Sequence, residues 1–172
     1  MFEDEDDDFL ENKLNEDLEQ FESHLKGKVI GFLDSDRLEA VIDHYIVNSQ
    51  YSKALSAAEL GVYHFQYNSI FHLRKAQAMA GMGLLKDAIE LLNIIEKAND
   101  SNTEIFLTKA ALFSQLRDPK NAIKYYRLAM EICDPEDRDE IYMDIAIEYQ
   151  NMSQFKEAIE ILIEAIKINS QN

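Results

Sequence analysis

Four alanines recur along this chain at almost constant spacing. Ala54, Ala88, Ala122 and Ala158 lie 34, 34 and 36 residues apart, each within an apolar stretch of helix-forming residues. A small residue that returns at one position indicates a place where two helices cross so closely that a larger side chain would separate them. The spacing therefore predicts a stacked array of helices, in which each repeat buries its apolar face against its neighbours.

The residues around each alanine repeat with it. In the last repeat, a large, a small and an aromatic residue precede two alanines, at Tyr142, Ala146, Tyr149, Ala158 and Ala165. The third repeat has Phe106, Ala110, Phe113, Ala122 and Ala129 in these positions, and the second has His72, Ala76, Met79, Ala88 and Ile95. The first repeat is the most degenerate, with Ile42 where a small residue is usual and Gly61 where the second alanine belongs.

This pattern resembles the tetratricopeptide repeat, a pair of antiparallel helices of about 34 residues. The resemblance covers residues 35–172, and the whole chain is most similar to acidic bacterial proteins of this family. It implies an all-α fold, a right-handed α-α superhelix of four helix-turn-helix repeats at 35–68, 69–102, 103–138 and 139–172. The family is a binding architecture, so the resemblance also implies a protein that is not an enzyme and holds no cofactor.

Local signals place the ends of the helices. Asp118 puts a capping side chain before Pro119, which favours the first position of a helix, and Asn102 and Ser69 are further helix-starting residues. Gly83 is expected in a short turn between paired helices. The predicted pairs are 36–48 with 51–65, 69–81 with 85–98, 103–116 with 119–132, and 138–151 with 154–168.

The first 33 residues do not follow the repeat. Residues 1–22 hold eleven acids against one base, Lys13, which accounts for −10 of the formal net charge of −16. Leu10, Leu14, Leu18, Phe21 and Leu25 form one stripe of an amphipathic helix that ends near Gly27. Two interpretations stay open: the helix caps the first repeat, which we favour because solenoid ends need covering, or it lies in the binding groove as an internal competitor.

Charge and targeting features narrow the classes of partner. The acidic balance argues against nucleic acid, because phosphate contacts need clustered Lys and Arg. No stretch approaches the roughly 18 apolar residues of a membrane span, and the acidic start does not resemble a secretory signal. The single cysteine, Cys133, suits a reducing compartment. We therefore expect a cytoplasmic protein that contacts neither membrane nor nucleic acid.

Catalytic and metal-binding patterns are not evident. Gly81-Met82-Gly83 lacks the third glycine of a dinucleotide loop and the Gly-Lys-Ser/Thr of a phosphate loop. The four histidines show no metal-ligand spacing, and the acidic run from Asp4 to Asp8 lacks the glycine and closing glutamate of a calcium loop. We expect no catalytic residue, metal or cofactor.

The resemblance implies that the first helices of the repeats line a groove for an extended or helical segment of another protein. Carried over by phase, this inward face is apolar, and exposed apolar strips of this size mark partner sites. The predicted groove residues are Ile46, Val47, Ile70, Leu73, Arg74, Gln77, Leu107, Thr108, Ala111, Met143, Asp144 and Ile147.

Chaperone-binding members of the family grip a carboxylate with several basic residues on their first helices. Here only Arg74 fits that pattern, so binding of chaperone tails is not expected.

Two lysines on the first helices allow two interpretations. Lys75 and Lys109 occupy equivalent positions one repeat apart. With Arg74 they form a basic ladder for an acidic peptide, or their alkyl stems cover the core while their ammonium groups reach water. We favour the second, because both lysines flank an alanine at a helix crossing.

The final helix is apolar nearly all round, with Ile161 and Ile163 expected on its outer side. A terminal repeat normally shows water a polar face. This predicts either further repeats beyond it or a homodimer through the helix.

The leading hypothesis is a scaffold that binds a protein or peptide segment in an apolar groove. One alternative is an acidic tail that binds a basic protein and loses it as salt screens the charges. The other is an adaptor portion of a larger repeat protein or enzyme.

Overall fold

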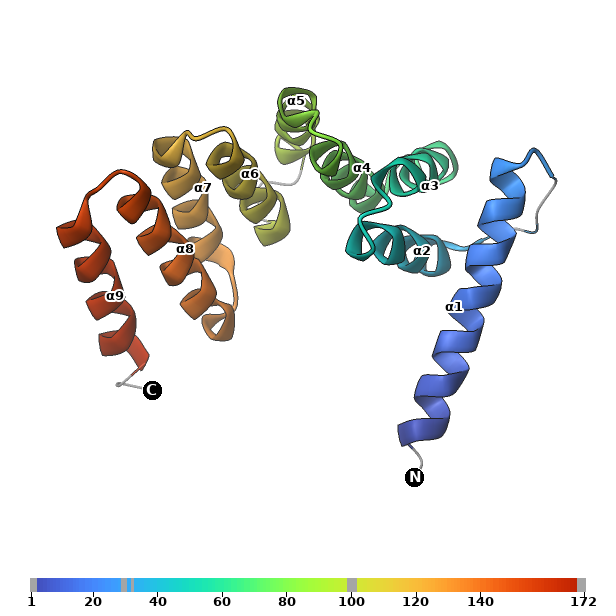
Figure 1. The fold of residues 1–172 in the computed structure, drawn as a ribbon, viewed down its shortest axis with the longest axis horizontal. Coiled ribbons are helices and arrows are strands. Elements are labelled where there is room, and N and C mark those ends of the chain that lie inside the picture. Colours follow the sequence, from blue (N-terminus) through green and yellow to red (C-terminus); the bar gives the residue numbers. More distant parts are fainter. Residues whose placement is uncertain (1–2, 29–30, 32, 99–101, 170–172) are drawn as a thin grey trace. The chain divides into compact units, whose positions relative to one another are not determined.

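A computed structural model shows an all-α protein built from paired helices (Figure 1). It describes residues 3–28, 31, 33–98 and 102–169. Within this part, side chains are described from residue 12 to residue 168, so those of the acidic run at 3–11 lie outside it. No β-strand occurs in the described residues.

The helices follow the predicted pairs closely. Each helix expected from the repeats is present, and its ends lie within two residues of the predicted ones. The described elements are α1 (Glu3–Leu25), α2 (Ser35–Val47), α3 (Tyr51–His64), α4 (Ser69–Gly81), α5 (Leu85–Glu96), α6 (Thr103–Gln115), α7 (Pro119–Ile132), the 3-10 turn η1 (Pro135–Asp137), α8 (Arg138–Asn151) and α9 (Phe155–Asn169).

Polar side chains cap the starts of several helices. Asp118 accepts a hydrogen bond from the backbone N–H of Asn121 at 3.2 Å, and Pro119 is the first residue of α7, as predicted. Asn102 caps α6 in the same way. At α4 the cap is Asn68, and the predicted starter Ser69 is the first helical residue. These caps satisfy backbone donors that a helix leaves without partners at its start.

The turn inside each repeat has one conformation, four times over. Its central residue is Ser49, Gly83, Arg117 or Ser153, with φ of 56°, 81°, 58° and 60°. The N–H of the following residue returns to a carbonyl of the preceding helix, for example from Leu84 to Met79 at 2.9 Å. This is the Schellman closure of a helix end. Only Gly83 adopts it without the steric cost that a Cβ imposes.

The chain divides into two compact units. Unit 1 is Met1–Leu91 and unit 2 is Leu92–Asn172, so the division falls inside α5. Each unit has a core of its own, and the two are described separately below.

The core of unit 1 is built around small residues. Ala54, Ala57 and Ala58 of α3 are fully buried, and Gly61 on the same helix faces the ring of Phe71. A Cβ built on Gly61 would lie 2.2 Å from a carbon of that ring. The glycine therefore stands where the pattern has an alanine because even a methyl group does not fit.

The N-terminal helix packs onto the first repeat through its second half. Phe21 of α1 is fully buried in the core of unit 1. Asp17 is 2% exposed and forms an ion pair with Arg37 of α2, and Glu22 pairs with Lys53 of α3 at 2.6 Å. The Arg37 pairing raises the pKa of the guanidinium, and the Lys53 pairing lowers the pKa of Glu22. These contacts support the cap interpretation over the groove competitor.

Unit 2 has one continuous apolar core from α6 to α9. Phe106 and Ala110 of α6, Ala122 of α7 and Ile145 of α8 belong to it, and Ala110, Ala122 and Ile145 are fully buried. The rings of Phe113 and Tyr125 stack at 5.4 Å between centroids. The alanines thus lie where neighbouring helices meet, as their spacing predicts.

The contact between Gly61 and Phe71 can be tested by adding one methyl group. Alanine is normally favoured over glycine in a helix by about 1 kcal/mol. We expect the opposite for Gly61→Ala, a loss of about 1–3 kcal/mol in the free energy of unfolding, because the new methyl overlaps the ring. Urea unfolding followed by circular dichroism measures it. The variant Gly61→Ala/Phe71→Leu should lose less than the sum of the two single changes, and a stabilised Gly61→Ala would contradict the packing.

Candidate functional site

An ion-pair network covers the first-helix face of unit 1. Arg74 of α4 lies 2.6 Å from Asp43 and 3.1 Å from Glu39, both on α2, and its side chain is 13% exposed. It also donates a hydrogen bond to Gln77 at 3.2 Å. Two carboxylates of α2 surround this one guanidinium. Arg74 is therefore engaged within the protein and does not present a cation to a carboxylate ligand.

The other predicted groove residues of unit 1 differ in exposure. Val47 is 81% exposed at the end of α2. Ile46 and Ile70 are half-buried and pack against the core of unit 1. Leu73 is 1% exposed, so its prediction as a ligand-contacting residue is wrong. Its side chain belongs to the packed interior, whereas the equivalent Leu107 is only half-buried.

In unit 2, the predicted face is open on α8 and partly closed on α6. Leu107 is half-buried against the core, Thr108 is half-buried and Ala111 is exposed. Met143 and Ile147, one turn apart on α8, are 60% and 48% exposed. Large apolar side chains thus reach solvent on α8.

Acidic groups line the same helix. Burial raises the pKa of Asp144, the carboxylates of Glu140 and Glu148 raise it further, and a hydrogen bond with Tyr126 opposes the shift. Burial likewise raises the pKa of Tyr126. Glu148 is 3% exposed and accepts a hydrogen bond from the hydroxyl of Ser114. A cation placed beside Asp144 would stabilise its charged form.

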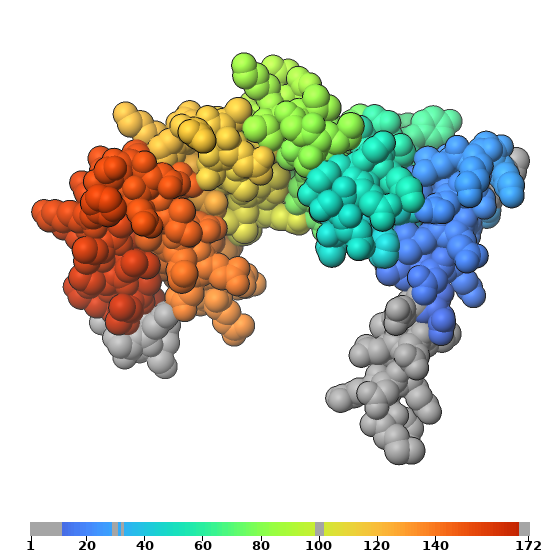
Figure 2. Space-filling view, in the orientation of Figure 1, coloured from blue at the N-terminus to red at the C-terminus, as the bar shows by residue number. Residues whose placement is uncertain are grey.

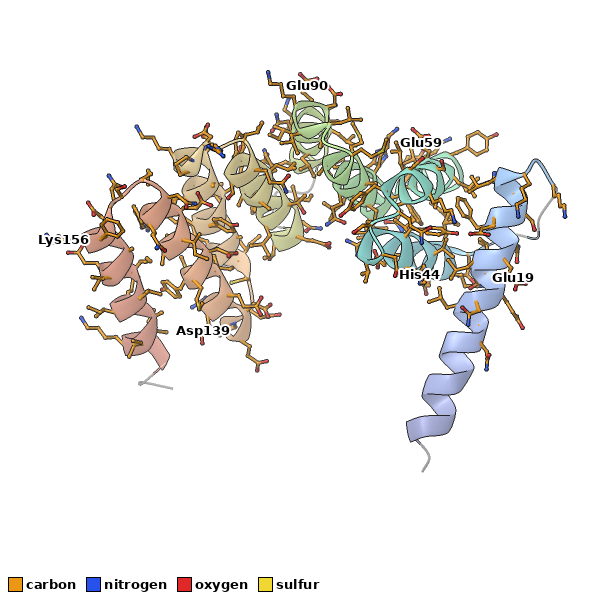
Figure 3. All side chains as sticks on the ribbon, in the orientation of Figure 1. Glu19, His44, Glu59, Glu90, Asp139 and Lys156 are labelled. Atoms are coloured by element: carbon orange, nitrogen blue, oxygen red, sulfur yellow. The ribbon has the colours of Figure 1, made fainter. Side chains whose placement is uncertain are left out.

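The two lysines at equivalent positions have different environments. Lys75 is partly exposed and pairs with Glu59 of α3 at 3.0 Å (Glu59 is labelled in Figure 3). Lys109 is fully buried: its ammonium group bonds to Glu96 and to Asn93 at 2.6 Å, and lies 4.2 Å from the ring centre of Tyr125. The prediction that both ammonium groups reach water is therefore wrong for Lys109. Because every one of these cations has an acidic partner, the basic-ladder interpretation also loses its support.

An apolar cavity of about 250 Å³ lies between α8 and α9. Met143 and Ile147 line it from α8, and Phe155, Ile159 and Leu162 line it from α9. The sequence analysis missed Phe155, Ile159 and Leu162. The 36-residue offset between Ala122 and Ala158 also aligns these three residues with Pro119, Ile123 and Tyr126 of the third repeat. Ile161, expected on the outer side of α9, is 4% exposed, which corrects that prediction, whereas Ile163 is 44% exposed as expected.

In the described part of the chain, no group of three or more His, Cys, Asp or Glu residues is arranged to hold a metal ion. No described helix combines the length and the apolar character needed to cross a membrane.

Comparison with known proteins agrees with the repeat geometry. Residues 103–134 and 139–172 match the tetratricopeptide repeat. The chain contains tetratricopeptide repeats. No curated protein matches it. Repeats of this family generally mediate protein–protein interactions and have no chemistry of their own.

Several solved structures share the fold. A crystal structure of MamA superimposes with a TM-score of 0.73 at 13% identity, covering 96% of this chain and 94% of that one. The MamA fragment from Desulfovibrio magneticus gives 0.66 at 11% identity, with coverages of 81% and 77%. TTC0263, a thermophilic tetratricopeptide protein from Thermus thermophilus, gives 0.67 at 19% identity, with coverages of 92% and 84%. These similarities show an all-α helical-repeat solenoid fold.

The buried ion pair of Lys109 yields a prediction about stability. Glu96→Ala leaves the buried ammonium group without its carboxylate, and we expect it to lower the free energy of unfolding by about 3 kcal/mol. Lys109→Met keeps the stem volume and removes the charge, so Glu96→Ala/Lys109→Met should recover most of the loss. Urea unfolding of the two variants measures this. A double variant no more stable than Glu96→Ala would show that the ammonium group does not depend on Glu96.

Proposed function

We propose that the protein is a non-enzymatic scaffold that binds a segment of another protein along the first helices of its repeats. The observation that carries the proposal is the exposure of large apolar side chains on these helices. Val47 is 81% exposed in unit 1, and Met143 and Ile147 are 60% and 48% exposed in unit 2. Apolar side chains one turn apart on a helix are the contacts through which a bound segment is held.

Electrostatics indicate the chemistry of the bound segment. In unit 1, the carboxylates of Glu39 and Asp43 lie beside the guanidinium of Arg74 on this face. In unit 2, Asp144 is half-buried among carboxylates that raise its pKa. A Lys or Arg side chain would relieve this repulsion, whereas an acidic segment would add to it. The proposed partner segment therefore combines apolar residues with basic ones.

Each unit carries further predicted groove residues on its own first helices. Ile46, Ile70, Gln77, Leu107, Thr108 and Ala111 are the predicted residues that accompany Val47, Arg74, Met143, Asp144 and Ile147 on the first helices. Leu73 is excluded because it is buried.

The experiment is affinity capture from the source cell's lysate with variants that add positive charge. Asp144→Lys and Val47→Lys place a cation on the proposed face, and we expect them to reduce capture of a partner by about tenfold or more, as the loss of a well-placed contact does. Glu131→Lys makes the same charge reversal as Asp144→Lys but on α7, at an exposed position away from this face, and should leave capture unchanged.

The same experiment distinguishes the acidic tail as an alternative site. A chain that starts at residue 12 lacks seven of the acids but keeps Asp17 and Phe21, which the first repeat needs for packing. Loss of partners with this truncation but not with Asp144→Lys or Val47→Lys would contradict the proposal. It would make the acidic segment the binding element.

A further inference from the structure

Glu148 is a charged residue at a position that the neighbouring repeats keep apolar. It lies two residues after the small residue of its repeat, where the second and third repeats have Ala78 and Leu112. All three side chains are buried, with exposures of 0% for Ala78, 1% for Leu112 and 3% for Glu148. A carboxylate loses its hydration at such a position. Departures of this kind from a local pattern are expected at functional sites.

The carboxylate of Glu148 has a hydroxyl partner and no cationic one. Its Oε1 accepts a hydrogen bond from the hydroxyl of Ser114 on α6. Among the described residues, Glu148 forms no ion pair. Burial raises the pKa of Asp144, one turn earlier on α8, and the carboxylate of Glu148 adds to that shift. A cation that bonds to the second oxygen of Glu148 would compensate this buried charge.

Glu148 lines a polar pocket of about 430 Å³. The pocket belongs to unit 2, whose helices α6 to α9 run from yellow-green to red in Figure 2. Ser114, Arg117 and Pro119 line it from the turn between α6 and α7, and Glu148 and Asn151 line it from α8. Arg117 and Asn151 are exposed, whereas Glu148 is buried. The size is that of a ligand site, since such pockets span roughly 300–1,000 Å³.

The ends of two helices add negative potential to the pocket. α6 ends at Gln115 and α8 ends at Asn151, close in sequence to the lining residues. The last carbonyl groups of a helix carry partial negative charge and favour a cation. Arg117 brings a positive charge to the lining, but its side chain is exposed, so water screens it more than it screens the buried Glu148. The inner end of the pocket therefore favours a positive group.

The acceptors in the pocket favour an ammonium group over a guanidinium group. A guanidinium fork binds best to both oxygens of a carboxylate, and one oxygen of Glu148 already accepts from Ser114. An ammonium group is a compact charge with three donors. The second oxygen of Glu148, the hydroxyl of Ser114 and the amide oxygen of Asn151 offer one acceptor to each of these donors.

We propose that this pocket binds the ammonium group of a lysine side chain, supplied by the protein segment that the first helices bind. The inference rests on the proposed function and names the basic residue of that segment. Glu148 directly follows Ile147 in α8, and Ile147 belongs to the proposed face. A segment that packs on Ile147 therefore passes beside the pocket, and one of its lysines enters it.

The probe is a single capped lysine, Nα-acetyl-lysine amide, titrated into the isotope-labelled 172-residue chain. Nα-acetyl-norleucine amide has a similar alkyl stem without the ammonium group, and Nα-acetyl-arginine amide carries a guanidinium group. We expect the lysine analogue to give saturable shifts of the backbone amide signals of Ser114, Arg117 and Glu148 in NMR spectra, with a dissociation constant on the order of millimolar. The arginine analogue should bind more weakly, and the norleucine analogue should give no saturable shift.

Two substitutions on α8 localise the binding. Glu148→Gln keeps the shape of the side chain and an acceptor for Ser114 but removes the charge, and we expect it to weaken binding of the lysine analogue by about tenfold or more. Glu140→Gln removes the same charge at an exposed position on α8 outside the pocket lining. It should leave binding within about twofold of the unchanged chain, because water and salt screen that charge. The same NMR spectra show that both variants stay folded.

Several results would overturn the proposal. They are absence of saturable binding of the lysine analogue, equal binding of the norleucine analogue, tighter binding of the arginine analogue, and binding that Glu148→Gln does not weaken. The comparison of the three analogues uses the unchanged chain, so it does not depend on how a variant folds. Loss of partner capture with Asp144→Lys and Val47→Lys tests the scaffold separately. That loss without binding of the lysine analogue would overturn the lysine pocket and leave the proposed function in place.

Discussion

The close crossing of helices at an alanine is the constraint on which the rest of this structure depends. Ala54, Ala88 and Ala122 are all fully buried. At that separation a larger side chain would push the helices apart, so the residues around the alanine must fit a fixed space. Gly61 shows the constraint at its limit, since Phe71 leaves no room even for a methyl group. The recurring left-handed turn keeps paired helices in the register that each crossing needs.

The same packing explains which surfaces are left to bind other proteins. Inside unit 2, α8 covers the groove of the repeat before it, and the acids and bases near the core are largely paired, as for Lys109 and Glu96. The surfaces that stay open include the face of the first helices and the last groove. Both combine exposed aliphatic side chains with acidic or neutral polar groups, and neither contains the cation cluster that a carboxylate or phosphate ligand requires. These features support the proposed binding of a protein segment.

The repeated sequence pattern made the fold predictable. The site was less predictable, because the sequence of a single repeat does not show which other helices pack against it. Four copies of one pattern place each helix to within two residues, and local signals such as Asp118-Pro119 add the caps. The exposure of a side chain depends on the helices that pack over it, and these helices belong to other parts of the chain. For this reason Leu73 and Ile161 were assigned to the wrong side. Lys109 was misjudged because its ammonium group meets Glu96 of another helix before it reaches water.

The most direct test compares one substitution at two equivalent crossings. Ala122→Val adds two methyl groups where α8 closes the groove, and we predict a loss of about 1–3 kcal/mol in the free energy of unfolding. Ala158→Val makes the same change beside the open groove, where the methyl groups have space, and should cost less than half as much. Urea unfolding of both variants measures the two losses in the free energy of unfolding. Equal losses, or a larger loss at Ala158, would contradict the view that stacked neighbours make the alanine crossings tight.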